Sequence, residues 1–266
     1  MKKLCAKNAD IYNLYEESVQ NVEFEVNFYK KMFKKYHSSE AITLREDFCA
    51  SAKISQEWVK SNHQNKAYAV DLDEKILKYA KENSHKNLDG GQLKRLRFIK
   101  ADSAKYISPK ADIISACNFS YWVFKKRAML INYFKNSLRC LNKKGLLILD
   151  AFGGYEAHQE LEERTKHKNF TYVWDQHKFN PVTNDITCFI HFEFRDKSEI
   201  KRAFKYEWRL WSLPEIRECL SEAGFKSVDI FMQGWDHKKN EETERFYKTT
   251  RCDADPGWLA YIIARK

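Results

Sequence analysis

The 266-residue sequence has no long hydrophobic run, no Pro/Gly linker and no C-x-x-C pair. Its apolar stretches, such as residues 145–149, are far shorter than the ~20 residues that span a bilayer. The basic start at Met1 lacks the apolar segment of a secretory signal, since Asn8 and Asp10 follow at once. We therefore expect neither a membrane segment nor a secretory leader.

The seven cysteines are scattered along the chain and odd in number. This spacing disfavours a zinc cluster and a disulfide framework, and it favours a reducing compartment. The sequence thus predicts a cytoplasmic protein without a metal site.

The net charge is +10, which would suit nucleic acid or an acidic partner. However, the lysines are dispersed in pairs over the whole chain, as on a solvated surface. Hydrophobic residues make up 43% of the chain, enough for a globular core. The charge alone does not select a partner, and nothing in the sequence indicates an oligomeric state.

Up to about residue 153, short apolar strands alternate with amphipathic helices, which predicts a parallel sheet with helices on both faces. The expected strands are 41–44, 67–70, 96–99, 112–116 and 146–149. Helices are expected at 51–60, after a cap at Asp73, and around 130–141.

After Gly153 and Gly154 the apolar period becomes two, which predicts an antiparallel meander of about three strands. These strands are expected at 170–174, 186–194 and 200–208. Ser212 and Glu215 form a capping box for a helix that ends at Gly224. Two last strands, at 227–232 and 258–264, could close the first sheet as a hairpin at one edge.

Polar groups follow four of the expected strands, where ligands bind in an open α/β sheet. The segment from Leu44 to Ala52 follows the first strand, and Asp71 with Leu72 follows the second. Asp102 and Ser103 come after the third, and Asn118, Phe119 and Tyr121 after the fourth. An acid at the second strand end suits ribose hydroxyls. Each group also has a simpler interpretation: Asp73 caps a helix, Asp102 with Ser103 forms a turn, and Asn118 caps the next helix.

The segment 41–152 resembles the class I S-adenosylmethionine-dependent methyltransferases. The stretch Leu-Arg-Glu-Asp-Phe-Cys at 44–49 is similar, more closely, to that of a little-characterised family of these enzymes. Further similar stretches cover most of the chain, namely 12–16, 18–20, 118–121, 171–174 and 208–211.

This resemblance implies an α/β fold with a Rossmann-like, seven-stranded, mostly parallel sheet and an antiparallel β-meander insertion. It implies a Rossmann-like methyltransferase domain at 41–153 and 212–266, with a substrate cover at 154–211. Residues 1–40 would form an N-terminal helical lid carrying Tyr12, Tyr15 and Gln20, although packing explains the tyrosines equally well.

Carried over by position, the resemblance implies S-adenosyl-L-methionine as the cofactor. Glu46 and the backbone of residues 48–52, with Phe48, Cys49 and Ala50 among them, would lie beside its methionine portion. Asp71 would hold the ribose, Asp102 and Ser103 the adenine, and Asn118 and Phe119 would border the methyl-donor end. Leu72 is also expected to bind the cofactor. Arg45 would pair with the cofactor carboxylate or neutralise Glu46 and Asp47.

Methyltransferases of this class show G-x-G in the first loop, where Ala50 and Ala52 stand here. If these residues are right-handed they fit without strain, but left-handed conformations cost on the order of 1 kcal/mol each. The cofactor site could therefore be weakened.

No catalytic residue follows from the sequence, and His191 and Tyr121 are the weak candidates. Three hypotheses remain: a methyltransferase acting on a small molecule, one acting on RNA or protein, and a nucleoside-binding relative without catalysis. The expected meander favours the first, because its aromatic residues could wall a pocket. The net charge supports the second, and Ala50 with Ala52 the third.

Overall fold

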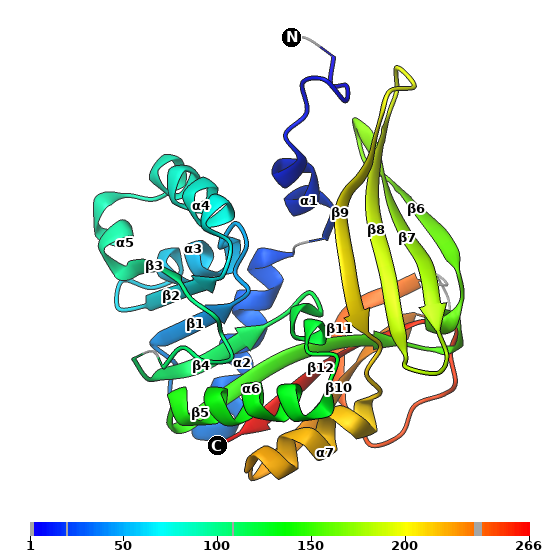
Figure 1. The fold of residues 1–266 in the computed structure, drawn as a ribbon. Helices are drawn as coiled ribbons and strands as arrows, with labels where there is room; N and C mark the ends of the chain where they lie inside the picture. The colour runs from blue at the N-terminus through cyan, green and yellow to red at the C-terminus, as the bar shows by residue number, and fades with distance from the viewer. Residues whose placement is uncertain (1–2, 20, 108, 237–240) are drawn as a thin grey trace. The chain divides into compact units, whose positions relative to one another are not determined.

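The computed structural model describes residues 3–19, 21–107, 109–236 and 241–266 (Figure 1). Gln20, named above in the N-terminal segment, lies outside the described residues. The chain forms two compact units. The Rossmann-like unit comprises residues 22–152, 212–253 and 258–266, and the four-stranded unit comprises 1–21, 153–211 and 254–257.

The Rossmann-like unit contains an eight-stranded sheet in the order β11-β10-β12-β5-β4-β1-β2-β3. Its first five strands along the chain are β1 (Thr43–Asp47), β2 (Lys66–Asp71), β3 (Leu96–Lys100), β4 (Ala111–Ala116) and β5 (Leu141–Gly153). These five pair in parallel. The α/β class and the mostly parallel sheet are confirmed.

The other three strands form the antiparallel end of this sheet: β10 (Ser227–Asp236), β11 (Glu241–Lys248) and β12 (Trp258–Arg265). The predicted pairing of 227–232 with 258–264 is confirmed. The prediction of seven strands and an edge hairpin is wrong, because β11 pairs with β10 and forms the edge. Its sequence, Glu-Glu-Thr-Glu-Arg-Phe-Tyr-Lys, is too polar to be recognised by apolar periodicity.

Helices cover both faces of this sheet. On one face, α2 (Val22–His37) and α3 (Lys53–Lys60) pack against Leu44, Ile113 and Ile148. The other face carries α6 (Arg127–Cys140) and α7 (Leu213–Ala223), which contact one another. The remaining helices of the unit are α4 (Glu74–Asn87), α5 (Gly90–Arg95) and the 3-10 helix η1 (Ser120–Val123).

Three predicted helix boundaries are confirmed. Asp73 is the N-cap of α4 and accepts a bond from the Lys75 N–H. Ser212 and Glu215 form the capping box of α7, which ends at a left-handed Gly224. These signals were readable because they depend only on residues adjacent in the sequence.

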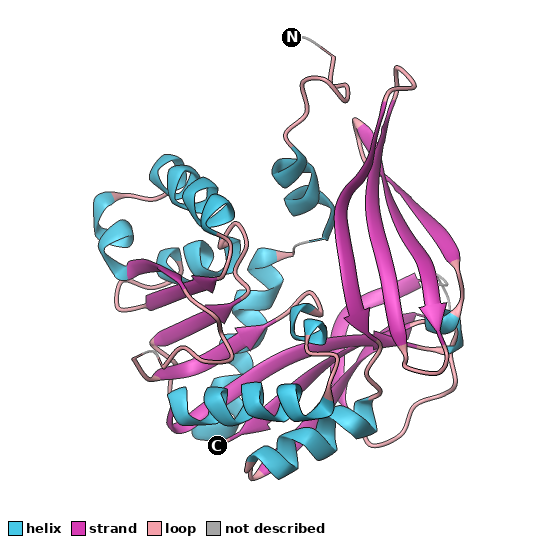
Figure 2. Ribbon diagram, viewed as in Figure 1, coloured by secondary structure: helices cyan, strands magenta, loops and turns pink. Residues whose placement is uncertain are grey.

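The described part of the four-stranded unit consists of an antiparallel sheet, one α-helix and one 3-10 helix (Figure 2). Its elements are α1 (Ile11–Val19), η2 (Tyr155–His158), β6 (Leu161–Lys166), β7 (Phe170–Asn180), β8 (Asp185–Phe194) and β9 (Glu199–Arg209). The three predicted strands correspond to β7, β8 and β9. The highly charged β6 was missed. Leu14 of α1 packs with Phe170 and Phe192 of the sheet.

The predicted N-terminal lid is divided between the two units. Residues 1–21 belong to the four-stranded unit, whereas α2 contributes Val26, Phe28 and Tyr29 to the Rossmann-like core. Of the described helices, none has the length and apolar character needed to cross a bilayer.

Candidate functional site

The carboxyl ends of β4, β1 and β2 lie beside one another in the sheet. The strand order reverses between β4 and β1, and such a switch point opens a crevice that binds ligands in open α/β sheets. The segments expected to bind the cofactor follow these strands and β3. The sheet therefore brings residues 46–52, 71–72, 102–103 and 118–119 to a common edge.

Two turns at this edge have an unusual backbone. Five of the nine described non-glycine residues with positive φ lie here. They are Phe48, Ala52, Asn118 and Phe119, each with φ of 56°, and Ala50 with φ of 44°. Left-handed conformations at non-glycine residues cost about 1–2 kcal/mol each and cluster at functional sites.

Ala50 and Ala52 are both left-handed, so the loop has a backbone that glycine would adopt without strain. Phe48 is a third left-handed residue of this loop, outside the two positions of the G-x-G pattern. Cys49, between Phe48 and Ala50, is buried, and its N–H donates to the Val70 carbonyl at 3.0 Å. Within the loop, the Ala52 N–H donates to the Cys49 carbonyl at 2.6 Å.

Asp71 connects this loop to the end of β2. Its Oδ2 accepts a bond from the Ala50 N–H and its Oδ1 one from the Asp73 N–H, both at 2.9 Å. A carboxylate has about four acceptor positions, so capacity for ribose hydroxyls remains. The neighbouring Leu72 is 68% exposed.

Arg45 has only part of the second of its two expected roles, because it pairs with Asp47 whereas Glu46 bonds to Ser55. Its side chain is fully buried, and its Nε lies 2.6 Å from Asp47 Oδ1. It also donates to the main-chain carbonyls of Ser103 and Tyr106, both at 3.2 Å. Tyr133 donates its hydroxyl to the second Asp47 oxygen at 2.9 Å. Arg45 therefore neutralises Asp47 and fixes the turn after β3.

The strand β1 ends at Asp47, three residues later than predicted. Apolar periodicity stopped the expected strand at Leu44 because three charged residues follow. All three charged residues are nevertheless buried in the protein. Arg45 and Asp47 pair on one face of the sheet, and Glu46 points to the other face. Glu46 accepts from the Ser55 N–H of α3 at 2.8 Å, and burial raises the pKa of Glu46 to about 7.

The residues after β3 form a compact turn. Asp102 Oδ1 accepts from the Ala104 N–H at 2.9 Å, and Asp102 also lies 3.3 Å from the Lys105 ammonium. Ser103 is buried, and its carbonyl accepts from Arg45 and Asn136. The turn interpretation of this pair is observed, while their contact with adenine stays a prediction.

Asp150, at the end of the apolar run in β5, was missed by the sequence analysis. Its two carboxylate oxygens accept from the N–H groups of Asn118 at 2.7 Å and Phe119 at 2.9 Å. It thereby holds the left-handed turn after β4. Burial raises the pKa of this carboxyl to about 7. Its position directly after the four apolar residues 146–149 is the sequence feature that could have identified Asp150 as a site residue.

The two weak catalytic candidates have structural partners. Tyr121 is fully buried, and its hydroxyl donates to the Asp150 main-chain carbonyl at 2.8 Å. This geometry gives Tyr121 a packing role rather than a catalytic one.

His191 belongs to the four-stranded unit, where its Nδ1 accepts from the Arg202 N–H at 2.9 Å. Its Nε2 therefore carries the proton and lies 3.1 Å from Asp175 Oδ2. Glu162 lies beside this pair, and the three could be taken for metal ligands. With both ring nitrogens occupied, His191 has no lone pair for a metal ion or for a substrate proton.

No family model and no curated protein matches the chain. Solved structures do match. A methyltransferase from Clostridium acetobutylicum, described as S-adenosylmethionine-dependent, is 17% identical, with a TM-score of 0.66 over 95% of this chain and 98% of that one. CalS10, an amino pentose methyltransferase from Micromonospora echinaspora solved with S-adenosylmethionine bound, is 11% identical, with a TM-score of 0.66 over the whole of both chains.

The glycopeptide N-methyltransferase MtfA, solved with S-adenosylmethionine, is 11% identical, with a TM-score of 0.56 over 93% of this chain and 95% of that one. At these identities the likeness establishes the fold alone. The chain has the Rossmann-like fold of S-adenosylmethionine-dependent methyltransferases.

Proposed function

We propose that this chain is an S-adenosylmethionine-dependent methyltransferase that acts on a small molecule. The observation that carries the proposal is the pair of left-handed turns at the ends of β1 and β4. In a fold shared with cofactor-bound methyltransferases, they keep a glycine-like backbone at positions 48, 50, 52, 118 and 119 without a single glycine. A loop that no longer bound a cofactor would be free to relax to unstrained conformations.

The donor set around this edge fits the cofactor. Asp71 would accept the ribose hydroxyls, with Leu72, Asp102 and Ser103 around the adenine. The backbone of residues 48–52 would lie along the methionine portion, and Asn118 with Phe119 at the donor end. The cofactor supplies an activated methyl group, so the chain's own task is to orient the two reactants.

The four-stranded unit is the proposed acceptor-binding part. One face of its sheet carries the half-buried aromatic residues Tyr172, Trp174 and Tyr206, and Tyr206 stacks on Trp208 with ring centroids 4.3 Å apart. Aromatic faces suit sugar rings and cationic groups. The names of CalS10 and MtfA point to an amino pentose and a glycopeptide as acceptors, which supports a small or medium-sized molecule here.

A transfer assay tests this proposal. The protein is incubated with methyl-labelled cofactor and fractionated cell extract, and the labelled product is then treated with nuclease or protease. We expect label in a low-molecular-mass fraction that resists both treatments. Label that nuclease or protease releases would overturn the small-molecule assignment, and cofactor binding without transfer to any fraction would favour a nucleoside-binding protein without catalysis.

A further inference from the structure

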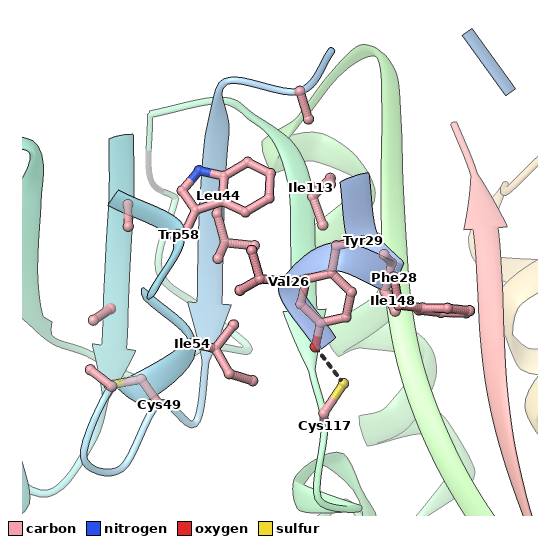
Figure 3. Packing of buried hydrophobic residues seen from close by; sticks show 14 of the residues in the cluster. Val26, Phe28, Tyr29, Leu44, Cys49, Ile54, Trp58, Ile113, Cys117 and Ile148 are labelled. Carbon is pink, nitrogen blue, oxygen red and sulfur yellow. Dashed lines mark hydrogen bonds between the residues drawn. The ribbon is translucent and has the colours of Figure 1, made fainter. Parts of the chain in front are cut away.

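A buried acid, Glu25, lies on α2 in the same layer of the unit as the candidate site. Glu25 is only 6% exposed. Its Oε2 lies 3.4 Å from the Tyr29 hydroxyl. That hydroxyl lies 3.0 Å from the Cys117 thiol, a contact that Figure 3 marks with a dashed line. Cys117 directly precedes the left-handed turn after β4. Glu25 is therefore at the carboxyl end of the sheet.

Strand register places two more acids in this layer. Glu46 of β1 pairs with Ser115 of β4, and Ser115 pairs with Ile148 of β5, so their side chains share one face. Asp150 and Cys117 each follow two residues later on the same face. Glu25, Glu46 and Asp150 thus approach one another from α2, β1 and β5, and we call these three residues the acid cluster.

A polar atom without a partner lies in the same layer. Ser115 is 1% exposed, and its hydroxyl has no hydrogen-bond partner among the described residues. Because an unpaired buried hydroxyl costs about 1–3 kcal/mol, such atoms usually face a water or a ligand. This hydroxyl points to the face that the acid cluster occupies.

The acid cluster lacks a positive charge. Asp47, on the opposite face, is neutralised by Arg45, but in the described part of the chain no lysine, arginine or histidine pairs with Glu25, Glu46 or Asp150. Burial, followed by mutual repulsion, raises the pKa of Glu25 well above its usual value. Each of the three residues is only 5–6% exposed.

We propose that Glu25 binds the ammonium group of the cofactor's methionine portion, with Glu46 and Asp150 completing the charge match. This rests on the proposed function. A cation at this place would compensate the buried carboxylates, and an ammonium would supply three donors to them. Glu25 is thereby a specificity residue for the amino-acid half of the cofactor.

The test compares Glu25→Gln with Glu23→Gln, an exposed acid two residues earlier on the same helix. Calorimetric titration uses S-adenosylmethionine, S-adenosylhomocysteine and 5′-methylthioadenosine, the last of which lacks the ammonium. Loss of one charge-assisted contact predicts that Glu25→Gln weakens binding of the first two by about 10-fold or more. Binding of 5′-methylthioadenosine should stay within about twofold, and Glu23→Gln should leave all three unchanged.

Equal weakening of all three ligands by Glu25→Gln, or no weakening, would overturn the inference. If the unaltered protein binds none of the three, the proposed function itself fails, which is a distinct result.

A second measurement uses the unaltered protein in two buffers of different ionisation enthalpy near pH 7. The titratable groups facing Glu25 are Asp150, Glu46 and Tyr29, with Cys117 and Tyr261 beside them. We expect net proton release with S-adenosylmethionine and less with 5′-methylthioadenosine. Equal release would contradict an ammonium contact.

Discussion

At the level of single residues, the loop at 48–52 has one of the two properties that a glycine motif provides. Glycine permits positive φ, and it also leaves room for close approach. At 50 and 52 the chain retains the left-handed backbone with alanine, the smallest side chain that can replace glycine. The departure from G-x-G therefore changes the energy of the loop more than its shape.

Replacing Ala50 or Ala52 with glycine should stabilise the protein. Relief of left-handed strain exceeds the entropy that glycine adds to the unfolded chain, for a net gain of about 0.5–1 kcal/mol each. Ala128→Gly, at an exposed position in the first turn of α6, is the control without left-handed strain and should not stabilise the protein. Chemical denaturation measures all three, and destabilisation by both loop variants would show that the strain is not present.

Asp71 and Asp73 lie two residues apart but should respond differently. Asp71→Ala removes the proposed ribose acceptor and the partner of the Ala50 N–H, so affinity for S-adenosylmethionine and 5′-methylthioadenosine should fall together by 10-fold or more. Asp73→Ala removes only the α4 cap and should cost about 1 kcal/mol of stability without changing affinity. The reverse pattern in titration and denaturation would refute the assignment.

At the scale of elements, the end of β5 positions the end of β4. Asp150 accepts both N–H groups of the left-handed turn. The turn at Asn118 and Phe119 should therefore depend on this carboxylate.

Asp150→Asn places an amide group where two acceptor oxygens are needed. Leaving one buried N–H unpaired should cost about 1–3 kcal/mol and reduce cofactor affinity. The control is Asp253→Asn, an exposed acid of the same unit, which should change stability by less than about 0.5 kcal/mol. Equal effects of the two variants would mean that Asp150 does not hold the turn.

Elements with a local signal could be predicted from the sequence. The caps at Asp73 and Ser212 and the alternation of β7 to β9 depend on neighbouring residues, and each was predicted. The extension of β1 through Arg45 and Asp47 was not, because the ion pair and the Tyr133 bond that make this strand end tolerable come from distant elements. The polar strands β6 and β11 were missed for a similar reason, since their pairing comes from neighbours instead of their own periodicity.

Some residues of the candidate site could likewise be predicted from the sequence, and others could not. Strand ends at Asp71 and Asn118 were found from position alone. Glu25 and Asp150 required the packed structure, because helix–sheet packing and strand register bring them beside Glu46. The left-handed φ values could not be read from residues such as Phe48, which rarely adopt them.

At the scale of the whole molecule, buried acids couple stability to pH. Burial raises the pKa of both Glu46 and Asp150 to about 7 in the folded state. Between the ordinary carboxyl range and pH 7, the folded protein thus binds more protons than the unfolded chain, so stability falls as the pH rises through this window. The cofactor-free protein should lose on the order of 2–4 kcal/mol between pH 5 and pH 8.

Denaturation across this pH range checks that loss, and Glu46→Gln should flatten the profile. A stability that rises steadily from pH 5 to pH 8 would show that these carboxyls are not buried as described. Because the bound cofactor supplies positive charge, its stabilising effect should be larger at pH 8 than at pH 6.

The left-handed turns at the carboxyl ends of β1 and β4 should bind S-adenosylmethionine despite their strain. Calorimetric titration of the unaltered protein at pH 8 tests this expectation. We expect saturable binding with one site per chain and a dissociation constant below about 1 mM, the upper end of the range common for enzyme substrates. No detectable binding of S-adenosylmethionine or S-adenosylhomocysteine at millimolar concentration would contradict it.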